Sequence, residues 1–323
     1  MTNSSEVTVA AVGVHVLDTH VIGIDSLPAG STGQIVETIR LSPAGTAGGT
    51  AVVLSRLGAT VRSYGAIGTD PIGDALSAAL VREGVDVTGL VRTDAAQTSA
   101  SVIPVRPNGD RPAWHCIGAN GAFTVADIDL ATLDGCTHLH LGGPEFLGGP
   151  AAAELLSYAR DKGLSTSIDL LAPGDPGMLE WIVAALPYAD YLLPNDEQVL
   201  GFTGADDLVT ACRALVDAGA GCVAVTHGSK GALVVTADEV ITVPAFQIDV
   251  VDTTGCGDAF SAGFILGRAE GRTLREAAVL GCAAAAQVAQ GLGTDAGSYD
   301  LAAVDAFAAR TPARDSVNAA PSE

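Results

Sequence analysis

Three observations predict an α/β protein with a mostly parallel central sheet flanked by helices and a small lid of β-strands. Short β-like runs, often rich in valine, alternate with longer Ala/Leu-rich segments, as in strand–helix–strand units. Two segments, at about 15–45 and 97–118, break this alternation and resemble strands without helices between them. The 323 residues are 48% apolar, enough for one large core, and contain no fixed-period repeat or low-complexity linker. We therefore expect a single domain over residues 1–310.

The alternation assigns the elements of the central sheet in order. A strand at 7–14 is followed by a helix at 51–57 and a strand at 61–66. Further strands are expected at 137–141, 165–170, 191–193 and 222–226, and further helices at 151–161, 206–218 and 259–267. The segment 311–323 is polar and contains two prolines, so we expect a frayed, disordered tail there.

Composition excludes several classes of partner. A net charge of −21, with Lys162 and Lys230 as the only lysines, argues against binding nucleic acid or docking on an anionic membrane. A phosphate site would therefore depend on backbone N–H groups, local arginines and a metal. The six cysteines are scattered without a C-x-x-C pair, which indicates neither a zinc site nor a disulfide framework. No basic leader or apolar run of about 20 residues is present, so we expect a cytoplasmic protein.

The segment 252–258 (DTTGCGD) has the composition of an anion site at a helix start. Gly255 and Gly257 let the backbone turn so that successive N–H groups point one way, and the expected helix adds a positive dipole end. Asp258 would be repelled by a bound phosphate unless it removes a proton from an attacking hydroxyl. This combination is typical of a phosphotransferase.

Other polar residues in this pattern leave two interpretations open. Asp18 follows the first expected strand, where it could contact a ligand or cap a loop. Asn195, with Glu197 and Gln198 beside it, could orient magnesium through waters or cap a helix. Cys256 at a helix N-terminus could be a nucleophile, but no histidine lies near it in sequence.

Familiar nucleotide and metal motifs are not indicated. The glycine-rich turn at 45–49 does not match the G-x-G-x-x-G spacing, and no G-x-x-x-x-G-K-[ST] segment occurs. His138 and His140 lie on one face of an expected strand, where packing or hydrogen bonding is favoured over metal binding.

Taken together, these segments resemble the PfkB family of carbohydrate kinases, which includes ribokinase, fructokinases and adenosine kinases. The resemblance extends from Gly13 to Gly293, and segment 252–258 is similar to the family signature D-T-x-G-A-G-D, with Cys256 in place of the usual Ala. The other matching segments are 13–18, 45–58, 65–73, 118–120, 194–197 and 225–231. The resemblance implies a ribokinase-like fold and an ATP-dependent carbohydrate kinase that uses Mg²⁺.

The resemblance also implies roles for the matching positions. Asp258 would be the base for the sugar hydroxyl, and the amides of Gly255, Cys256 and Gly257 would hold the transferring phosphoryl group. The implied sugar contacts are Asp18, Gly45, Gly49 and Asn120, and the implied ATP contacts are Asn195, Thr226, Gly228 and Gly231. The implied metal contacts are Glu197 or Gln198 for Mg²⁺, indirectly, and Asp252 and Thr254 for a monovalent cation such as K⁺.

The chain departs from the family at positions that bear on the substrate. Gly49 stands where a sugar-binding Asn is usual, Gln198 where an acidic residue is usual, and Ala44 where the first Gly of a pair is usual. The Glu that touches ribose in ribokinase would fall near Gly142. Our leading hypothesis is a kinase for a sugar or sugar-like molecule. A nucleoside kinase is the runner-up, and a ligand-binding protein that has lost catalysis is a third possibility.

Lid strands in this family often pair between subunits. The resemblance therefore implies a homodimer through the lid, which would cover an exposed strand edge at residues 98–105.

Overall fold

The computed structural model describes residues 7–24, 26, 28–106, 111–171 and 173–314. A central sheet contains β1 (Thr8–Gly13), β4 (Thr60–Gly68), β5 (Asp86–Thr93), β8 (His138–Gly142), β9 (Ser165–Asp169), β10 (Tyr191–Leu192), β11 (Val223–Thr226), β12 (Ala232–Val235) and β13 (Val240–Val243). Their order is β13-β12-β11-β10-β9-β8-β1-β4-β5. Neighbours from β5 to β11 are parallel, whereas β12 and β13 form an antiparallel edge. The mostly parallel sheet predicted from the sequence is confirmed.

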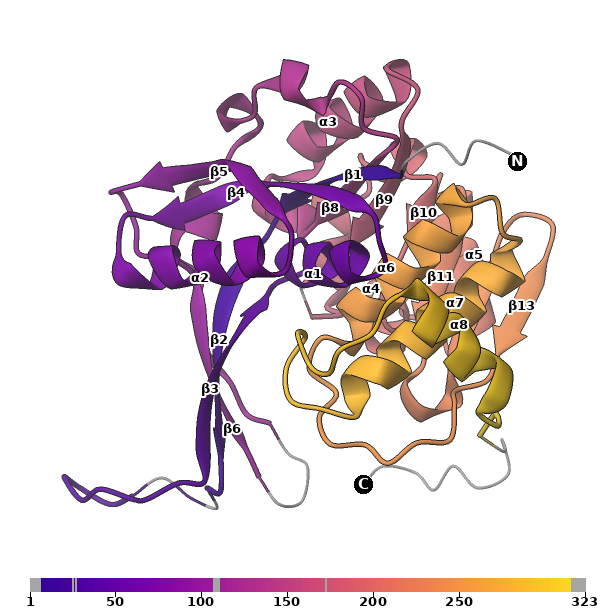
Figure 1. The fold of residues 1–323 in the computed structure, drawn as a ribbon. Helices are drawn as coiled ribbons and strands as arrows, with labels where there is room; N and C mark the ends of the chain where they lie inside the picture. The colour runs from indigo at the N-terminus through magenta and orange to yellow at the C-terminus, as the bar shows by residue number, and fades with distance from the viewer. Residues whose placement is uncertain (1–6, 25, 27, 107–110, 172, 315–323) are drawn as a thin grey trace.

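Helices cover both faces of this sheet (Figure 1). They are α1 (Gly48–Arg56), α2 (Pro71–Arg82), α3 (Gly149–Asp161), α4 (Asp196–Thr203), α5 (Leu208–Asp217), α6 (Cys256–Ala269), α7 (Leu274–Ala289) and α8 (Leu301–Arg310). Alternate residues of β1 enter two separate cores, Val9 with α1, α2, α6, α7 and α8, and Ala10 with α3, α4 and α5. Among the described residues, none of these helices is long and apolar enough to span a bilayer.

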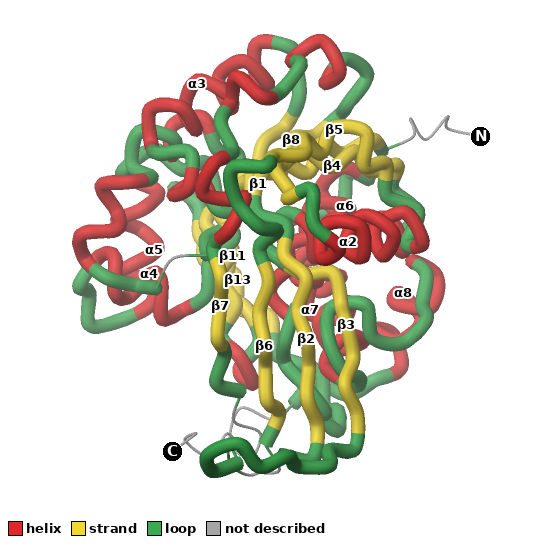
Figure 2. Tube along the Cα trace, turned by 90° about the vertical axis from the view of Figure 1, so that its left-hand side faces the viewer, coloured by secondary structure: helices red, strands yellow, loops and turns green. Residues whose placement is uncertain are grey.

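A second sheet arises from the two segments in which the expected alternation breaks. It contains β2 (Val16–Ile22), β3 (Thr38–Ala44), β6 (Ala100–Val105) and β7 (Trp114–Cys116), in the order β3-β2-β6-β7. Figure 2 shows this sheet face on, with α7 and α8 behind it. The strand edge predicted at 98–105 is wrong, because β6 pairs with β2 on one side and with β7 on the other. The edge strands are β3 and β7.

The two faces of the second sheet differ in character because side chains alternate along each strand. Asp18 and His20 on β2 point to one face and are buried. Val102 on β6 and Trp114 on β7 are paired in register and are 42% and 52% exposed. One face is therefore polar and turned towards the body of the protein, and the other is apolar and exposed.

The connection between the sheets places this polar face beside the ligand-binding edge of the central sheet. Gly13, Gly142 and Asp169 end parallel strands in matching register, and β2 begins only three residues after β1 ends. Ligands of open α/β sheets bind at the carboxyl ends of such strands. A site at this edge would lie between the two sheets.

The C-terminal segment differs from the sequence prediction. Ala313 forms an antiparallel bridge with Phe246, and the flanking backbone bonds join Gln247 to Pro312 and Arg314 to Ala245. Residues 312–314 are therefore paired with 245–247 and not frayed, because the Pro312 carbonyl and the Arg314 N–H find partners there. The rest of that segment, 315–323, lies outside the described residues.

Candidate active site

The glycine-rich segment 252–258 forms the turn that begins α6. Gly255 caps the helix with φ 77°, and a Cβ at this position would lie 2.2 Å from Thr294 Oγ1, so only glycine fits. The amides of Gly257 and Asp258 lie in the first turn, where the helix itself supplies no acceptor. The amide of Cys256, also predicted to hold an anion, instead donates to the Thr253 carbonyl at 3.2 Å. The turn therefore offers an anion site built from the first-turn amides and the positive end of α6.

Asp258 is the carboxylate predicted to act as a base, and it lies in this same first turn, partly buried. Burial raises the pKa of Asp258 well above its ordinary value, and the charges of Asp169 and Asp18 raise it further. Gly49, at the start of α1, is packed directly against it, since a Cβ there would lie 2.2 Å from Asp258 Oδ2. A carboxylate in these surroundings binds a proton readily, as a general base requires.

Asp169 is a residue of this site that the sequence analysis missed. It ends β9, where its Oδ2 accepts a hydrogen bond from Ser261 at 2.9 Å and its Oδ1 accepts one from the Leu170 amide at 2.7 Å. Burial raises its pKa to about 7, with a further contribution from the charge of Glu145. Its position at the carboxyl end of an expected strand was the signal that could have identified it.

Asp18 approaches the site from β2 of the second sheet. Its neighbours in register are Ser42 on β3 and Ser101 on β6. Burial raises the pKa of Asp18, and a hydrogen bond from Ser101 opposes that effect. The negative charge of Asp18 contributes to the raised pKa of Asp258. The structure thus brings together two residues, Asp18 and Asp258, that are 240 positions apart in the sequence.

Two predicted sugar contacts instead shape the backbone around the site. Gly45 has φ 90°, and a Cβ there would lie 2.6 Å from the Val14 carbonyl. Both polar atoms of the Asn120 side chain bond the backbone of His15, at 3.2 Å from its N–H and 3.0 Å from its carbonyl. The side-chain amide of Asn120 thus holds the turn between β1 and β2, and its contact with sugar stays a prediction.

A cleft of about 250 Å³ adjoins the anion site. Thr226, Gly228 and Gly231, the predicted ATP contacts, line it together with Cys256 and Gly257. Its apolar walls come from Phe246, Ile248, Val250, Phe260, Ala285 and Ala289. An apolar wall beside an anion site suits a flat heterocyclic base attached to phosphate groups.

The predicted magnesium and ATP contacts on α4 form a capping box. Asn195 Oδ1 accepts a hydrogen bond from the backbone N–H of Gln198 at 2.8 Å, and Gln198 Oε1 accepts one from the backbone N–H of Asn195 at 2.9 Å. Gln198 Nε2 donates to the Leu170 carbonyl at 3.0 Å. The side chain of Gln198 thereby bonds the backbone through both its oxygen and its nitrogen, and its indirect contact with magnesium stays a prediction. Asn195 is bridged to Thr226 beside the cleft, and Glu197 is exposed next to it.

The predicted monovalent-cation ligands are already bonded to a guanidinium. Arg111 Nη1 lies 2.9 Å from both Asp252 Oδ1 and Thr254 Oγ1, and Nη2 bonds Thr253 Oγ1. Burial alone would raise the pKa of Asp252, but the amides of Thr254 and Gly293, followed by Arg111, bring it below its ordinary value. The expected cation therefore does not fit these two side chains as the structure arranges them.

The two histidines of β8 and the Cys256 thiol have the surroundings that the sequence favoured. His138 and His140 are buried on β8, and both bond Ser167 Oγ at 2.8 Å. Burial lowers the pKa of His138 to about 3 and that of His140 to about 4, so neither is charged near neutral pH. Burial also raises the pKa of the Cys256 thiol to about 12, which disfavours the nucleophile hypothesis.

The chain is similar in sequence to carbohydrate kinases over most of its length. The family model described as pfkB family carbohydrate kinase matches residues 10–300. The chain is 31% identical to an ATP-dependent ribose-1-phosphate kinase of Halopiger xanaduensis, over 75% of this chain and 78% of the relative. It is 26% identical to a ribokinase of Haemophilus influenzae, over 83% of this chain and 87% of the relative.

A solved structure shares the fold. An E. coli protein assigned as a ribokinase II, determined with ATP and Mg²⁺, matches with a TM-score of 0.80 and 22% identity. The match covers 94% of this chain and 99% of that one. The second sheet and the central sheet thus belong to the ribokinase-like fold that the sequence predicted.

Proposed function

Since the chain belongs to the pfkB family of carbohydrate kinases, we propose that it transfers the γ-phosphoryl group of ATP to a hydroxyl of a sugar or sugar-like molecule, with Asp258 as the base. The observation that carries this proposal is the position of Asp258 in the first turn of α6, with its pKa raised by burial and by neighbouring carboxylates. A carboxylate beside an anion site opposes phosphate binding unless it accepts a proton during the reaction.

In the proposed reaction the acceptor hydroxyl lies between the two sheets, where Asp18 orients it. Its oxygen forms a bond to the γ-phosphorus, the bond from that phosphorus to the β–γ bridging oxygen breaks, and the hydroxyl proton moves to the Asp258 carboxylate. The amides of Gly257 and Asp258 face the oxygens of the transferring group and stabilise their charge. ADP and the phosphorylated acceptor then leave.

The nucleotide is proposed to occupy the cleft beside α6. Its base would lie against Phe246, Ile248 and Ala285, and its phosphates would extend towards Gly257. Magnesium, when bound, would reduce the negative charge of the nucleotide phosphates, and it commonly keeps several waters. Glu197, an exposed carboxylate at the start of α4, fits an indirect contact through such waters.

An acceptor panel tests the proposal. We expect at least one of D-ribose, ribose-1-phosphate, deoxyribose and fructose to release ADP from ATP with kcat of about 1–100 s⁻¹, the usual range for kinases. The product is identified by mass spectrometry, and ATP without acceptor is the control. Adenosine as the preferred acceptor would favour the nucleoside kinase alternative. Binding of a sugar in calorimetry, without acceptor-dependent ADP release from any compound, would favour a non-catalytic binding protein.

A homodimer through the second sheet is also proposed. Leu41, Thr19, Val102 and Trp114 form one row across its outer face by strand register, and Leu41 is 50% exposed. An apolar row of this kind on a protruding sheet is more stable when a second copy covers it.

Light scattering after gel filtration tests this assembly. We expect the wild type to have the mass of a dimer and Val102→Asp to have the mass of a monomer, because a buried unpaired carboxylate at the interface is unfavourable. Val240→Asp is the matched control, since Val240 is 40% exposed on β13 of the other sheet. A monomeric wild type, or a Val102→Asp variant that remains dimeric, would contradict the proposal.

A further inference from the structure

Arg111 joins the second sheet to the segment that precedes the anion site. It lies between β6 and β7, and its guanidinium contacts the side chains of Asp252, Thr253 and Thr254. Arg111 is 141 residues away from Asp252 in the sequence, so only the fold brings them together. The Asp252 side chain is fully buried in this ion pair, whereas 29% of the Arg111 side chain is exposed.

We infer that Arg111 is a built-in cation, which takes the place of a monovalent metal ion at Asp252 and Thr254 and makes the enzyme independent of K⁺. The inference rests on the proposed kinase function for its catalytic readout, but its structural basis is independent of the substrate.

The side-chain oxygens that would bind a monovalent cation already accept hydrogen bonds from the protein. Asp252 Oδ1 accepts from Arg111 Nη1 and from the amide and hydroxyl of Thr254, at 2.9, 3.0 and 2.9 Å. Asp252 Oδ2 accepts from the Gly293 amide at 3.0 Å. Both carboxylate oxygens are therefore satisfied by the protein. A metal ion contacting Asp252 Oδ1 and Thr254 Oγ1 would compete with the guanidinium for the same oxygens.

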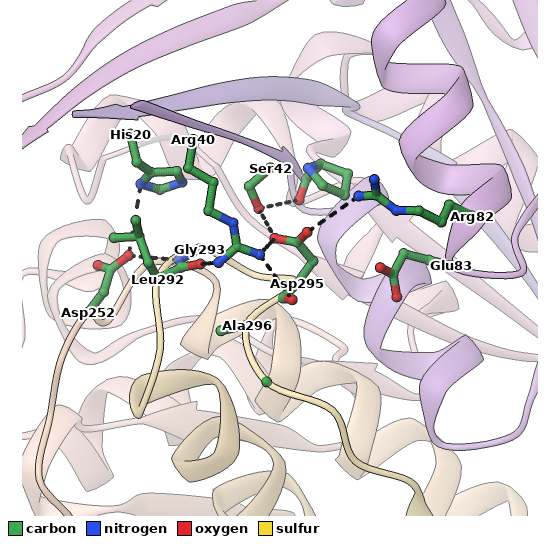
Figure 3. Close-up of polar contacts among 12 residues, drawn as sticks. His20, Arg40, Ser42, Arg82, Glu83, Asp252, Leu292, Gly293, Asp295 and Ala296 are labelled. Atoms are coloured by element: carbon green, nitrogen blue, oxygen red, sulfur yellow. Dashed lines mark hydrogen bonds and ion pairs between the residues drawn. The ribbon is translucent and has the colours of Figure 1, made fainter. Parts of the chain in front are cut away.

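The charge of the Asp252 carboxylate is balanced by Arg111. The Asp252 carboxylate carries one negative charge, and Arg111 supplies one positive charge that is always present. His20 Nδ1 lies 3.9 Å from Asp252 Oδ2 (Figure 3), so an imidazole side chain also occupies space beside this carboxylate. A second cation beside the guanidinium would be repelled at short range in a poorly solvated site. The local charge is already balanced without a metal ion.

Further contacts join the second sheet to the loop near Asp252. Figure 3 shows Arg40 and Ser42 of β3 reaching the neighbouring loop, where Arg40 Nη2 lies 2.9 Å from Asp295 Oδ1 and Ser42 donates to the same oxygen at 2.6 Å. Arg40 also bonds the Leu292 carbonyl. The second sheet, which carries Asp18, thus contacts both the segment that contains Asp252 and the loop that contains Asp295. Arg111 is a positioning residue that acts through Asp252 on the turn leading to the anion site.

The catalytic test compares cations at constant ionic strength. We expect the wild-type rate to be the same, within about twofold, in choline, sodium and potassium chloride, because the Arg111 guanidinium already neutralises the Asp252 carboxylate. Arg111→Met should lose about 10- to 100-fold in kcat/KM in choline chloride and recover most of it in potassium chloride, because a bound ion would replace the lost charge. Arg111→Lys should remain largely independent of K⁺. Arg92→Met removes an exposed arginine on β5 and serves as the control.

Thermal unfolding provides a readout that does not require a substrate. Potassium chloride should raise the Tm of Arg111→Met relative to choline chloride, since an ion that binds only the folded state stabilises it. The wild type and Arg92→Met should each have the same Tm in potassium chloride as in choline chloride. A wild-type rate or Tm that depends specifically on K⁺ would overturn the inference. So would an Arg111→Met variant that folds and shows no cation dependence in either measurement. If no acceptor is ever phosphorylated, the proposed function fails while the thermal comparison still decides the role of Arg111.

Discussion

Asp258→Asn should lower the rate of phosphoryl transfer by about 10²- to 10⁴-fold, the usual contribution of a general base. The amide is nearly the same size as the carboxylate, so the start of α6 and the nucleotide cleft should keep their shape. Removing a negative charge beside the phosphates should leave the affinity for an ATP analogue unchanged or slightly higher. The measurements are kcat from ADP release with the best acceptor and Kd from calorimetry.

The matched control for this variant is Asp74→Asn. Asp74 also lies in the first turn of a helix, α2, but it is exposed and pairs with Arg92. It should retain wild-type turnover. Near-normal phosphorylation by Asp258→Asn would show that the carboxylate is not the base, whatever else the site does.

The same assignment sets the sign of the pH dependence. Burial and the charges of Asp169 and Asp18 raise the pKa of Asp258, so its base form is lost as the pH falls. Wild-type kcat/KM should therefore decrease on acidification, at a higher pH than for an ordinary aspartate. Asp169→Asn removes one repelling charge and should move this acidic limb to lower pH. An unchanged limb, or one moved to higher pH, would contradict the electrostatic coupling of the two residues.

Local sequence was sufficient to predict the turn that begins α6, because its geometry depends on neighbours in the chain. The left-handed turn at Gly255 and the first turn of α6 follow from the spacing of Gly255, Gly257 and Asp258. The pattern N-x-x-Q at 195–198 equally contained its capping box, which sequence reasoning kept as an alternative to magnesium binding. Local hydrogen bonding favoured the cap.

Tertiary contacts account for what the sequence did not reveal. Arg111 contacts Asp252 only because β6 and β7 place it beside the segment that precedes α6. The order of strands in the second sheet is likewise a property of pairing between distant segments, so β6 could not be recognised as an interior strand. Asp169 was hidden for a simpler reason: a single carboxylate at the end of a strand is common, and only its burial and its effect on Asp258 distinguish it.

Gly49 stands where the family resemblance implies a sugar-binding Asn, and the structure shows what a side chain at this position would meet. Its Cα faces the Asp258 carboxylate so closely that an added Cβ would lie 2.2 Å from Oδ2 and 2.7 Å from Cγ. Non-bonded heavy atoms are most favourable at about 3.5–4.0 Å, so a side chain at position 49 must displace this carboxylate. Gly49 therefore permits the observed placement of the base.

Gly49→Ala should consequently lower kcat by about 100-fold, the loss that a displacement of about 1 Å can cause in a catalytic group. Its effect on stability should be small, because two contributions oppose each other. Alanine favours the helix by about 0.5–1 kcal/mol over glycine, and the atoms it displaces belong to the end of a side chain, not to the backbone. Activity and Tm should thus separate, which a simple folding defect would not produce. Gly177→Ala, at a glycine with open space around it, is the control for both measurements.

Gly49→Asn extends the argument to substrate choice. It introduces the residue type that the resemblance implies at this position, yet the Cβ of asparagine would meet Asp258 as the Cβ of alanine would. If the position of Asp258 is what Gly49 protects, asparagine should reduce kcat at least as much as alanine for every acceptor. A Gly49→Asn variant that gains activity on a simple sugar would instead mean that the carboxylate moves without penalty. In that case the missing asparagine, not the placement of Asp258, would set the acceptor preference of this chain.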